Sequence, residues 1–267
     1  MIVAGCDVGS LTTKAVILNE KRMLGHAIIK SSFKPEESAE EVMQKALGDA
    51  GLSMDDIGFC VGTGYGRDRI PFVGRVFSEI ACHAKGAQWL IPQVRTIIDI
   101  GGQDCKAIKI DRDGAILKFI TNDKCAAGTG RFLEVMATLL DVDLDELGRL
   151  SAAAKNPLSL AATCTVWAQA EVIHHLNDEK PIPDIASAIN HAMAARVAIL
   201  ARNVGVEREV CMTGGVAKNV AVVANLEKLL DARVRRLRVD PQMVGALGAA
   251  IFAREKIGGS NDDRRGM

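Results

Sequence analysis

The chain opens with two apolar runs separated by a small polar turn. Residues 2–6 and 15–18 are apolar, and the segment between them holds Gly9, Ser10, Thr12 and Thr13. This pattern predicts a strand, a tight turn and a second strand, with a third strand near residues 23–30.

The same pattern recurs further along the chain. Residues 96–110 align with the opening segment at a constant offset of 92, which places Asp99 on Asp7 and Lys106 on Lys14. A duplicated strand-turn-strand segment, with an acid and glycines in each copy, predicts an α/β fold of two similar domains that face each other across a cleft.

Helical spacing of apolar residues accounts for most of the remaining chain. It predicts helices over residues 35–47, 78–90, 166–173 and 185–203, one after the Gly-Thr-Gly turn at 128–130, and a last one that begins near residue 241. We expect domain I to span residues 1–93, joined by the C-terminal helix 243–257, and domain II to span residues 94–242. The polar, glycine-rich residues 258–267 are predicted to form a disordered tail.

Both turns carry groups suited to phosphate. Backbone amides and hydroxyls after Asp7 can approach phosphate oxygens, and Asp7 at the strand end can hold a hydrated Mg²⁺. An Asp-x-Gly-[Ser/Thr] turn is common and weak evidence alone, but its repetition around Asp99 suggests two loops that grip one nucleotide. A third turn, Gly214-Gly215 after a strand, suits an adenosine or ribose. The chain has no P-loop sequence, and no Gly-x-Gly-x-x-Gly follows the first strand.

Two of the seven cysteines are predicted to lie at helix N-termini. Cys125 lies just before the Gly-Thr-Gly turn, and Cys164 lies before residues 166–173, with Thr163 or Thr165 placed to cap that helix. The amides and macrodipole of a first helical turn favour a thiolate, or a thiolate-bound anionic cluster, by roughly 0.3–1 kcal/mol. The alternative is that both are small buried core residues, which is the usual fate of a free cysteine.

The other cysteines are predicted to be packing residues: Cys6, Cys60, Cys82, Cys105 and Cys211. An odd number of cysteines with no Cys-x-x-Cys pair argues against a disulfide framework and against a zinc knuckle. We therefore expect reduced thiols.

The amino-acid composition limits the classes of partner that the protein is expected to bind. Basic and acidic residues both number 33, so the overall charge does not favour nucleic acid or an anionic membrane. No apolar run reaches the roughly 18–20 residues of a membrane helix, and Asp7 interrupts the region where a signal peptide is apolar. We expect a cytoplasmic protein.

Several motifs together resemble a known superfamily. They are Asp7-Val8-Gly9-Ser10 with Lys14, residues 63–67, Asp99-Ile100-Gly101-Gly102-Gln103-Asp104, residues 122–131, Thr163-Cys164-Thr165-Val166 and residues 213–217. They resemble the ASKHA superfamily of acetate and sugar kinases, Hsp70 and actin, and within it the BadF/BadG/BcrA/BcrD ATPase family. More narrowly, the chain resembles the activators of 2-hydroxyacyl-CoA dehydratases, known as archerases.

The resemblance implies a homodimer with one 4Fe-4S cluster on its two-fold axis, held by Cys125 and Cys164 of each subunit. It implies ribonuclease-H-like, actin-like domains that bind ATP and Mg²⁺, a dehydratase as partner and a ferredoxin or flavodoxin as electron donor. Asp7 and Asp99 would organise Mg²⁺ and its waters, and Gln103 or Asp104 would position the attacking water.

The residues expected around ATP are Gly9, Ser10, Leu11, Thr12, Thr13, Lys14, Gly101, Gly102, Gly128, Thr129, Glu134, Gly214, Gly215, Lys218 and Gln242. Glu134 could instead be a first-turn partner of its helix dipole. Lys218 departs from the family, in which a glutamine is familiar at this position.

Three other functions remain open. The first is an ATPase subunit of a benzoyl-CoA reductase, which shares the motifs within a hetero-oligomer. The second is a small-molecule kinase of the same superfamily, against which the two cysteines argue. The third is an ATP-dependent scaffold resembling actin or Hsp70, which would carry no cluster.

Overall fold

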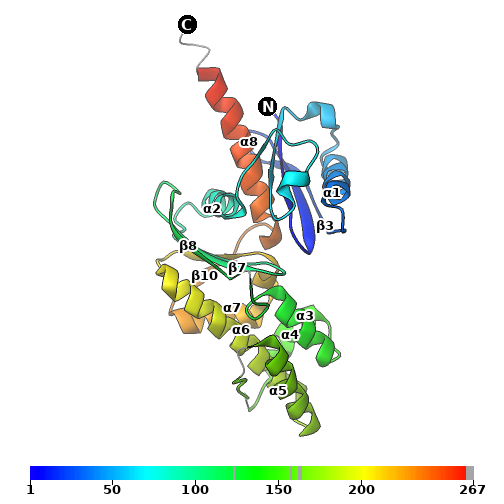
Figure 1. Ribbon diagram of the computed structural model, residues 1–267. Coiled ribbons are helices and arrows are strands. Elements are labelled where there is room, and N and C mark those ends of the chain that lie inside the picture. The colour runs from blue at the N-terminus through cyan, green and yellow to red at the C-terminus, as the bar shows by residue number, and fades with distance from the viewer. Residues whose placement is uncertain (123, 157, 162–163, 263–267) are drawn as a thin grey trace. The chain divides into compact units, whose positions relative to one another are not determined.

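The computed structural model describes residues 1–122, 124–156, 158–161 and 164–262, with side chains to residue 257. The chain forms two compact units (Figure 1). Unit 1 comprises Met1–Pro92 and Leu237–Met267, and unit 2 comprises Gln93–Arg236.

Unit 1 is built on a five-stranded sheet in the order β3-β2-β1-β4-β5. Its strands are β1 (Val3–Val8), β2 (Thr12–Leu18), β3 (Met23–Lys30), β4 (Phe59–Thr63) and β5 (Arg75–Val76). Strand β2 is antiparallel to both β1 and β3, whereas β4 runs parallel to β1 and β5 parallel to β4.

Helices cover both faces of this sheet. The side chains of β1 alternate between two cores: Ala4 and Cys6 pack with α1 (Pro35–Ala50), and Val3 packs with residues of α2 (Glu79–Leu90) and α8 (Val244–Asp262). Because successive side chains of a strand point to opposite faces, both faces of the apolar strand β1 are buried.

Unit 2 repeats this sheet in the order β10-β9-β6-β7-β8. Its strands are β6 (Thr96–Ile100), β7 (Cys105–Ile110), β8 (Ile116–Asn122), β9 (Val210–Thr213) and β10 (Val234–Arg235). The β6-β7-β8 strands are antiparallel, and β9 runs parallel to β6. The two sheets therefore share one topology, which confirms the predicted α/β fold of duplicated domains.

The helices of unit 2 share one core with its sheet. They are α3 (Gly130–Leu139), α4 (Leu144–Leu150), α5 (Thr165–Asn177), α6 (Ile182–Val204) and α7 (Val220–Leu230). Ile98 and Ile100 of β6 are buried in one cluster with Phe132, Met136 and Val197.

Short 3-10 helices connect these elements: η1 (Met54–Asp56), η2 (Arg67–Arg69), η3 (Ser151–Ala153), η4 (Gly215–Lys218) and η5 (Pro241–Met243). The turn at Gly215 thus opens into η4, and α7 starts later because the Asn219 side chain caps it. Helix α8 continues through Asp262, into the stretch expected to be a disordered tail. In the part of the chain that the structure describes, no helix is long and apolar enough to cross a bilayer.

Candidate active site

The first candidate phosphate loop joins β1 and β2. Asp7 is the penultimate residue of β1 and lies opposite Lys14 in the strand register, and the lysine Nζ donates to Asp7 Oδ2 at 3.2 Å. The loop is held at both sides: the Ser31 hydroxyl donates to the Gly9 carbonyl at 2.7 Å, and Gln242 Nε2 donates to the Thr12 hydroxyl at 3.4 Å. The loop is therefore preformed, and it brings Gln242 next to the predicted phosphate-binding residues.

One carboxylate oxygen of Asp7 is available to a ligand. Its side chain is 1% exposed, and Oδ1 has no hydrogen-bond partner among the described residues. Gly64 lies against this oxygen with a φ of +90°, and a side chain there would collide with it. An unpartnered buried acceptor costs about 1–3 kcal/mol. Such an oxygen fits a ligand-binding role, and Mg²⁺ is typically held in proteins through one or two carboxylates and several waters.

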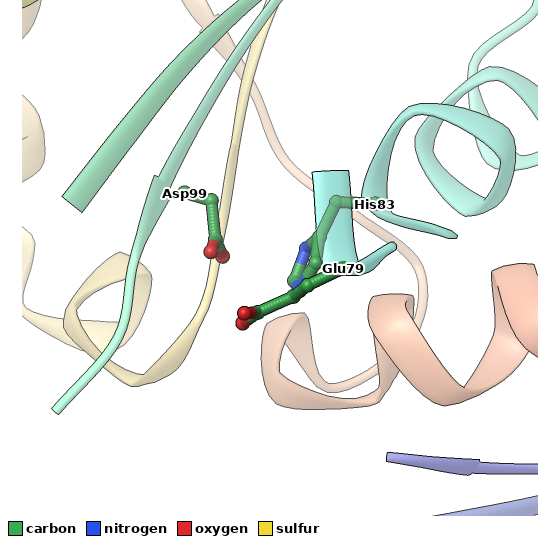
Figure 2. A group of neighbouring side chains, drawn as sticks. All are labelled: Glu79, His83 and Asp99. Atoms are coloured by element: carbon green, nitrogen blue, oxygen red, sulfur yellow. The ribbon is translucent and has the colours of Figure 1, made fainter. Parts of the chain in front are cut away.

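The second loop joins β6 and β7. Lys106 Nζ lies 3.4 Å from Asp99 Oδ2 and 2.7 Å from Asp104 Oδ2, and the Thr213 hydroxyl donates to Asp99 Oδ1 at 2.7 Å. Asp99, which projects from β6 in Figure 2, therefore has a partner on each oxygen.

The two loops share the same strand register but differ in the hydrogen bonds of their aspartates. Thr63 pairs with Asp7 in the register of β4, as Thr213 pairs with Asp99 in the register of β9. Thr213 donates to its aspartate, whereas the Thr63 hydroxyl donates to the Phe77 carbonyl at 3.1 Å. This difference leaves Asp7 Oδ1 unpartnered. The Thr-Gly pair is thus a second repeat in the chain, which was not predicted although Thr63-Gly64 and Thr213-Gly214 both follow an apolar run.

The second loop is bonded to the start of α3. The Gly130 amide donates to the Gly101 carbonyl and the Arg131 amide to the Gly102 carbonyl, both at 2.8 Å. The structure thus places Gly101 and Gly102 at the start of α3, whose N-cap is Thr129 and which Gly128 precedes in the chain.

The other residues predicted for the ATP site lie in different structural environments. Glu134 Oε2 lies 3.0 Å from Arg131 Nη1, so its carboxylate is engaged one turn away on α3. Gly214 has a φ of +82°, and a side chain there would collide with the Ile100 carbonyl. Lys218 ends η4, and Gln103 lies exposed in the second loop.

The seven cysteines fall into two groups. Cys6, Cys60, Cys82, Cys105 and Cys211 are buried, as predicted, whereas Cys125 and Cys164 are exposed. Burial raises the pKa of Cys60, Cys82 and Cys211 to about 12, and it also raises the pKa of Cys6 and Cys105. A buried protonated thiol is a poor ligand, so Cys125 and Cys164 are the candidate metal ligands.

The prediction that both cysteines start helices is right for Cys164 and wrong for Cys125. Cys164 is the N-cap residue of α5, and Thr165 is its first helical residue rather than its cap. Thr163 lies outside the described residues. Cys125 precedes α3 by five residues, because Thr129 is the N-cap there.

A loop stabilised by side chains separates Cys125 from α3. Asn122 Nδ2 donates to the Cys125 and Ala127 carbonyls, each at 3.0 Å, and the Thr129 hydroxyl donates to the Ala126 carbonyl at 2.6 Å. The helix dipole acts mainly within the first turn, so it does not favour a thiolate at Cys125 as expected. Asn122 therefore positions this cysteine, a role that no local sequence pattern indicates.

Comparisons with known proteins agree with these features. The chain is 40% identical over 257 residues to the (R)-2-hydroxyglutaryl-CoA dehydratase activating ATPase of Acidaminococcus fermentans, covering 94% of this chain and 96% of that protein. It superposes with a TM-score of 0.94, at 42% identity and 98% coverage of both chains, on the activator of the 2-hydroxyisocaproyl-CoA dehydratase from Clostridium difficile with bound ADPNP. A benzoyl-CoA reductase polypeptide of Thauera aromatica is 32% identical over 269 residues, covering 96% of this chain and 95% of that protein.

The model of one family spans nearly the whole chain. It matches residues 4–253, which include both phosphate loops and both exposed cysteines. The chain belongs to the BadF/BadG/BcrA/BcrD ATPase family.

Proposed function

We propose that this ATPase activates a 2-hydroxyacyl-CoA dehydratase, as a homodimer that couples ATP hydrolysis to the transfer of one low-potential electron. The observation that carries the proposal is the pair of exposed cysteines, Cys125 and Cys164, in a chain whose other five thiols are buried. The relatives named as dehydratase activators, at 40% and 42% identity over nearly the whole chain, support it.

The cysteine pair fits half of a 4Fe-4S site. Such a cluster is held by four protein thiolates, and one chain offers two accessible ones. A two-fold symmetric dimer supplies the same pair twice. When bound, the cluster supplies one-electron chemistry. The chain's own contribution is to present Cys125 on a loop fixed by Asn122 and Cys164 at the start of α5.

We assign Mg²⁺ binding and ATP hydrolysis to the two phosphate loops. Asp7, through Oδ1, would hold Mg²⁺ or its bound water, and Lys14 would neutralise charge on the phosphates. In the second loop, Asp99 would help to hold Mg²⁺ and its waters, and Gln103 or Asp104 would orient the water that attacks the γ-phosphate. The products are ADP and inorganic phosphate.

Within unit 2, hydrogen bonds connect the second phosphate loop to the start of α3, next to the loop that carries Cys125. The Gly101 and Gly102 carbonyls accept hydrogen bonds from the first amides of α3, and the loop before α3 carries Cys125. A shift of the second phosphate loop would therefore move the start of α3. This bonding supports a coupling of hydrolysis to electron transfer, with a ferredoxin or flavodoxin as donor and the dehydratase as acceptor. Accessible reduced thiols also suit a cytoplasmic protein.

The first test is iron and sulfide content after purification without oxygen. We expect about two irons per chain in the wild type, and loss of iron in Cys125→Ser and in Cys164→Ser. Cys211→Ser is the matched control, because that thiol is buried and should retain full iron content. An iron-free wild type that still hydrolyses ATP would contradict the proposal and favour a kinase.

The second test separates the dehydratase activator from a component of a benzoyl-CoA reductase. The reduced protein is incubated with MgATP and a 2-hydroxyacyl-CoA dehydratase, and formation of the unsaturated acyl-CoA is followed. We expect product only with ATP and reductant together. Activity that appears only in a hetero-oligomer with benzoyl-CoA reductase polypeptides would favour the alternative suggested by the Thauera aromatica relative.

A further inference from the structure

Glycines allow two helices of unit 1 to approach each other and β1 closely. A side-chain carbon at Gly248 of α8 would collide with the Cys82 carbonyl of α2, and one at Gly86 of α2 would collide with the Val244 carbonyl. One at Gly5 would likewise meet the backbone of α8. This close packing places His83, one residue after Cys82, beside the end of β1.

His83 and Asp7 meet at Gly245. A side-chain carbon built at Gly245 would lie 2.8 Å from Asp7 Oδ2 and 3.0 Å from His83 Nε2. Both side chains are almost fully buried, with exposures of 1% for Asp7 and 3% for His83. The imidazole therefore lies on the side of the Asp7 carboxylate that already faces Lys14, away from the unpartnered Oδ1 near Gly64.

Glu79 lies one helical turn from His83 (Figure 2). Its Oε1 is 3.9 Å from His83 Nε2, and its side chain is 24% exposed. That distance is longer than a direct hydrogen bond and suits a bridging water. His83 therefore lies near the Glu79 carboxylate and, like Asp7, borders the position of the missing Gly245 side chain.

We propose that His83 is a positioning residue of the ATPase site. With Lys14 it fixes the Oδ2 side of Asp7, so that Oδ1 stays directed at the hydrated cation, and it holds Glu79 beside the same ligand shell. Gly245 lacks a side chain because any carbon there would displace Asp7 or His83. This role concerns ATP hydrolysis alone and does not depend on the proposed electron transfer.

The test uses the full chain, with MgATP as the probe and no dehydratase or reductant in the assay. We expect His83→Ala to lower kcat for ATP hydrolysis and to raise the Mg²⁺ concentration for half-maximal rate, each about 10–100-fold, the range seen when an outer-shell partner is lost. The KM for ATP at saturating Mg²⁺ should change less than about 2-fold. His83→Gln should recover most of the loss, because its amide N–H can replace the imidazole donor.

Gly245→Ala provides an independent variant in case His83→Ala does not fold. We expect the same two changes in kcat and Mg²⁺ requirement, because the added methyl displaces the same two side chains. Two controls should keep the wild-type kcat and Mg²⁺ requirement: His26→Ala, whose imidazole is half exposed on β3, and Gly48→Ala, where a side chain would meet nothing within 4 Å.

Two results would overturn the proposal. One is an unchanged kcat and Mg²⁺ requirement in His83→Ala and Gly245→Ala. The other is a lowered Tm with activity that His83→Gln does not restore, which would make His83 a packing residue.

Discussion

The aspartates Asp7 and Asp99 occupy equivalent places in the repeat, yet only Asp99 is bonded through both oxygens. A threonine hydroxyl decides the difference, since Thr213 donates to Asp99 and Thr63 donates to the Phe77 carbonyl. At this scale the two loops differ: Asp7 offers a buried acceptor to a ligand, whereas both oxygens of Asp99 already accept hydrogen bonds.

We expect the two threonines to differ in their importance for stability. Thr213→Val removes a hydrogen bond to a buried charged group and should lower the free energy of unfolding by about 1.5–3 kcal/mol. Thr63→Val removes a bond between neutral groups and should cost about 0.5–1.5 kcal/mol. Urea denaturation of both variants measures the free energy of unfolding. An equal decrease in the two variants would contradict the assigned partners, Asp99 for Thr213 and Phe77 for Thr63.

Thiol reactivity provides a second prediction for individual residues. Iron-depleted protein treated with iodoacetamide in its folded state should be alkylated at Cys125 and Cys164 only. The other five thiols are buried, and three of them have a pKa of about 12, so the reactive thiolate is scarce near neutral pH. Mass spectrometry of peptides checks this. Rapid modification of Cys82 or Cys211 would show that these sites open to solvent.

At the scale of the elements, the effect of a glycine on helix packing depends on the space around it. Gly48 lies in α1 with open space around it, and Gly248 lies in α8 against the Cys82 carbonyl. The same substitution should therefore have opposite effects in the two helices.

Gly48→Ala should stabilise the protein by about 0.5–1 kcal/mol, because alanine favours the helix and meets no atom. Gly248→Ala should destabilise it by about 1–3 kcal/mol, because its methyl forces α2 and α8 apart. Thermal unfolding compares the two variants. A Gly248→Ala variant as stable as wild type would mean that α2 can shift without cost.

At the scale of the whole molecule, the two phosphate loops belong to different units. We expect ADPNP with Mg²⁺ to raise the Tm of the protein, because a ligand that binds the folded chain stabilises it. Asp7→Asn should reduce this increase, because a neutral amide is a weaker Mg²⁺ ligand than a carboxylate. A rise in Tm that is unchanged in Asp7→Asn or without Mg²⁺ would argue against the role assigned to Asp7.

The duplicated fold could be predicted from the sequence because its signals are local. Alternating apolar residues, the Gly-Ser-Thr turn and the repeat at an offset of 92 specify strands and hairpins without reference to distant contacts. The family resemblance rested on short motifs of the same kind, such as Asp99-Ile100-Gly101-Gly102. The burial of five cysteines followed from their apolar neighbours.

The tertiary structure decided what depends on residues far apart in the chain. Asp7 Oδ1 has no partner among the described residues because Thr63 bonds to Phe77, and His83 and Asp7 both border Gly245 because glycines let α2 and α8 pack closely. Cys125 lies ahead of α3 rather than at its start, since hydrogen bonds to Gly101 and Gly102 begin the helix at Gly130. A sequence pattern reports neighbours along the chain, whereas a hydrogen bond or a close packing contact is settled by the partners that folding brings within reach.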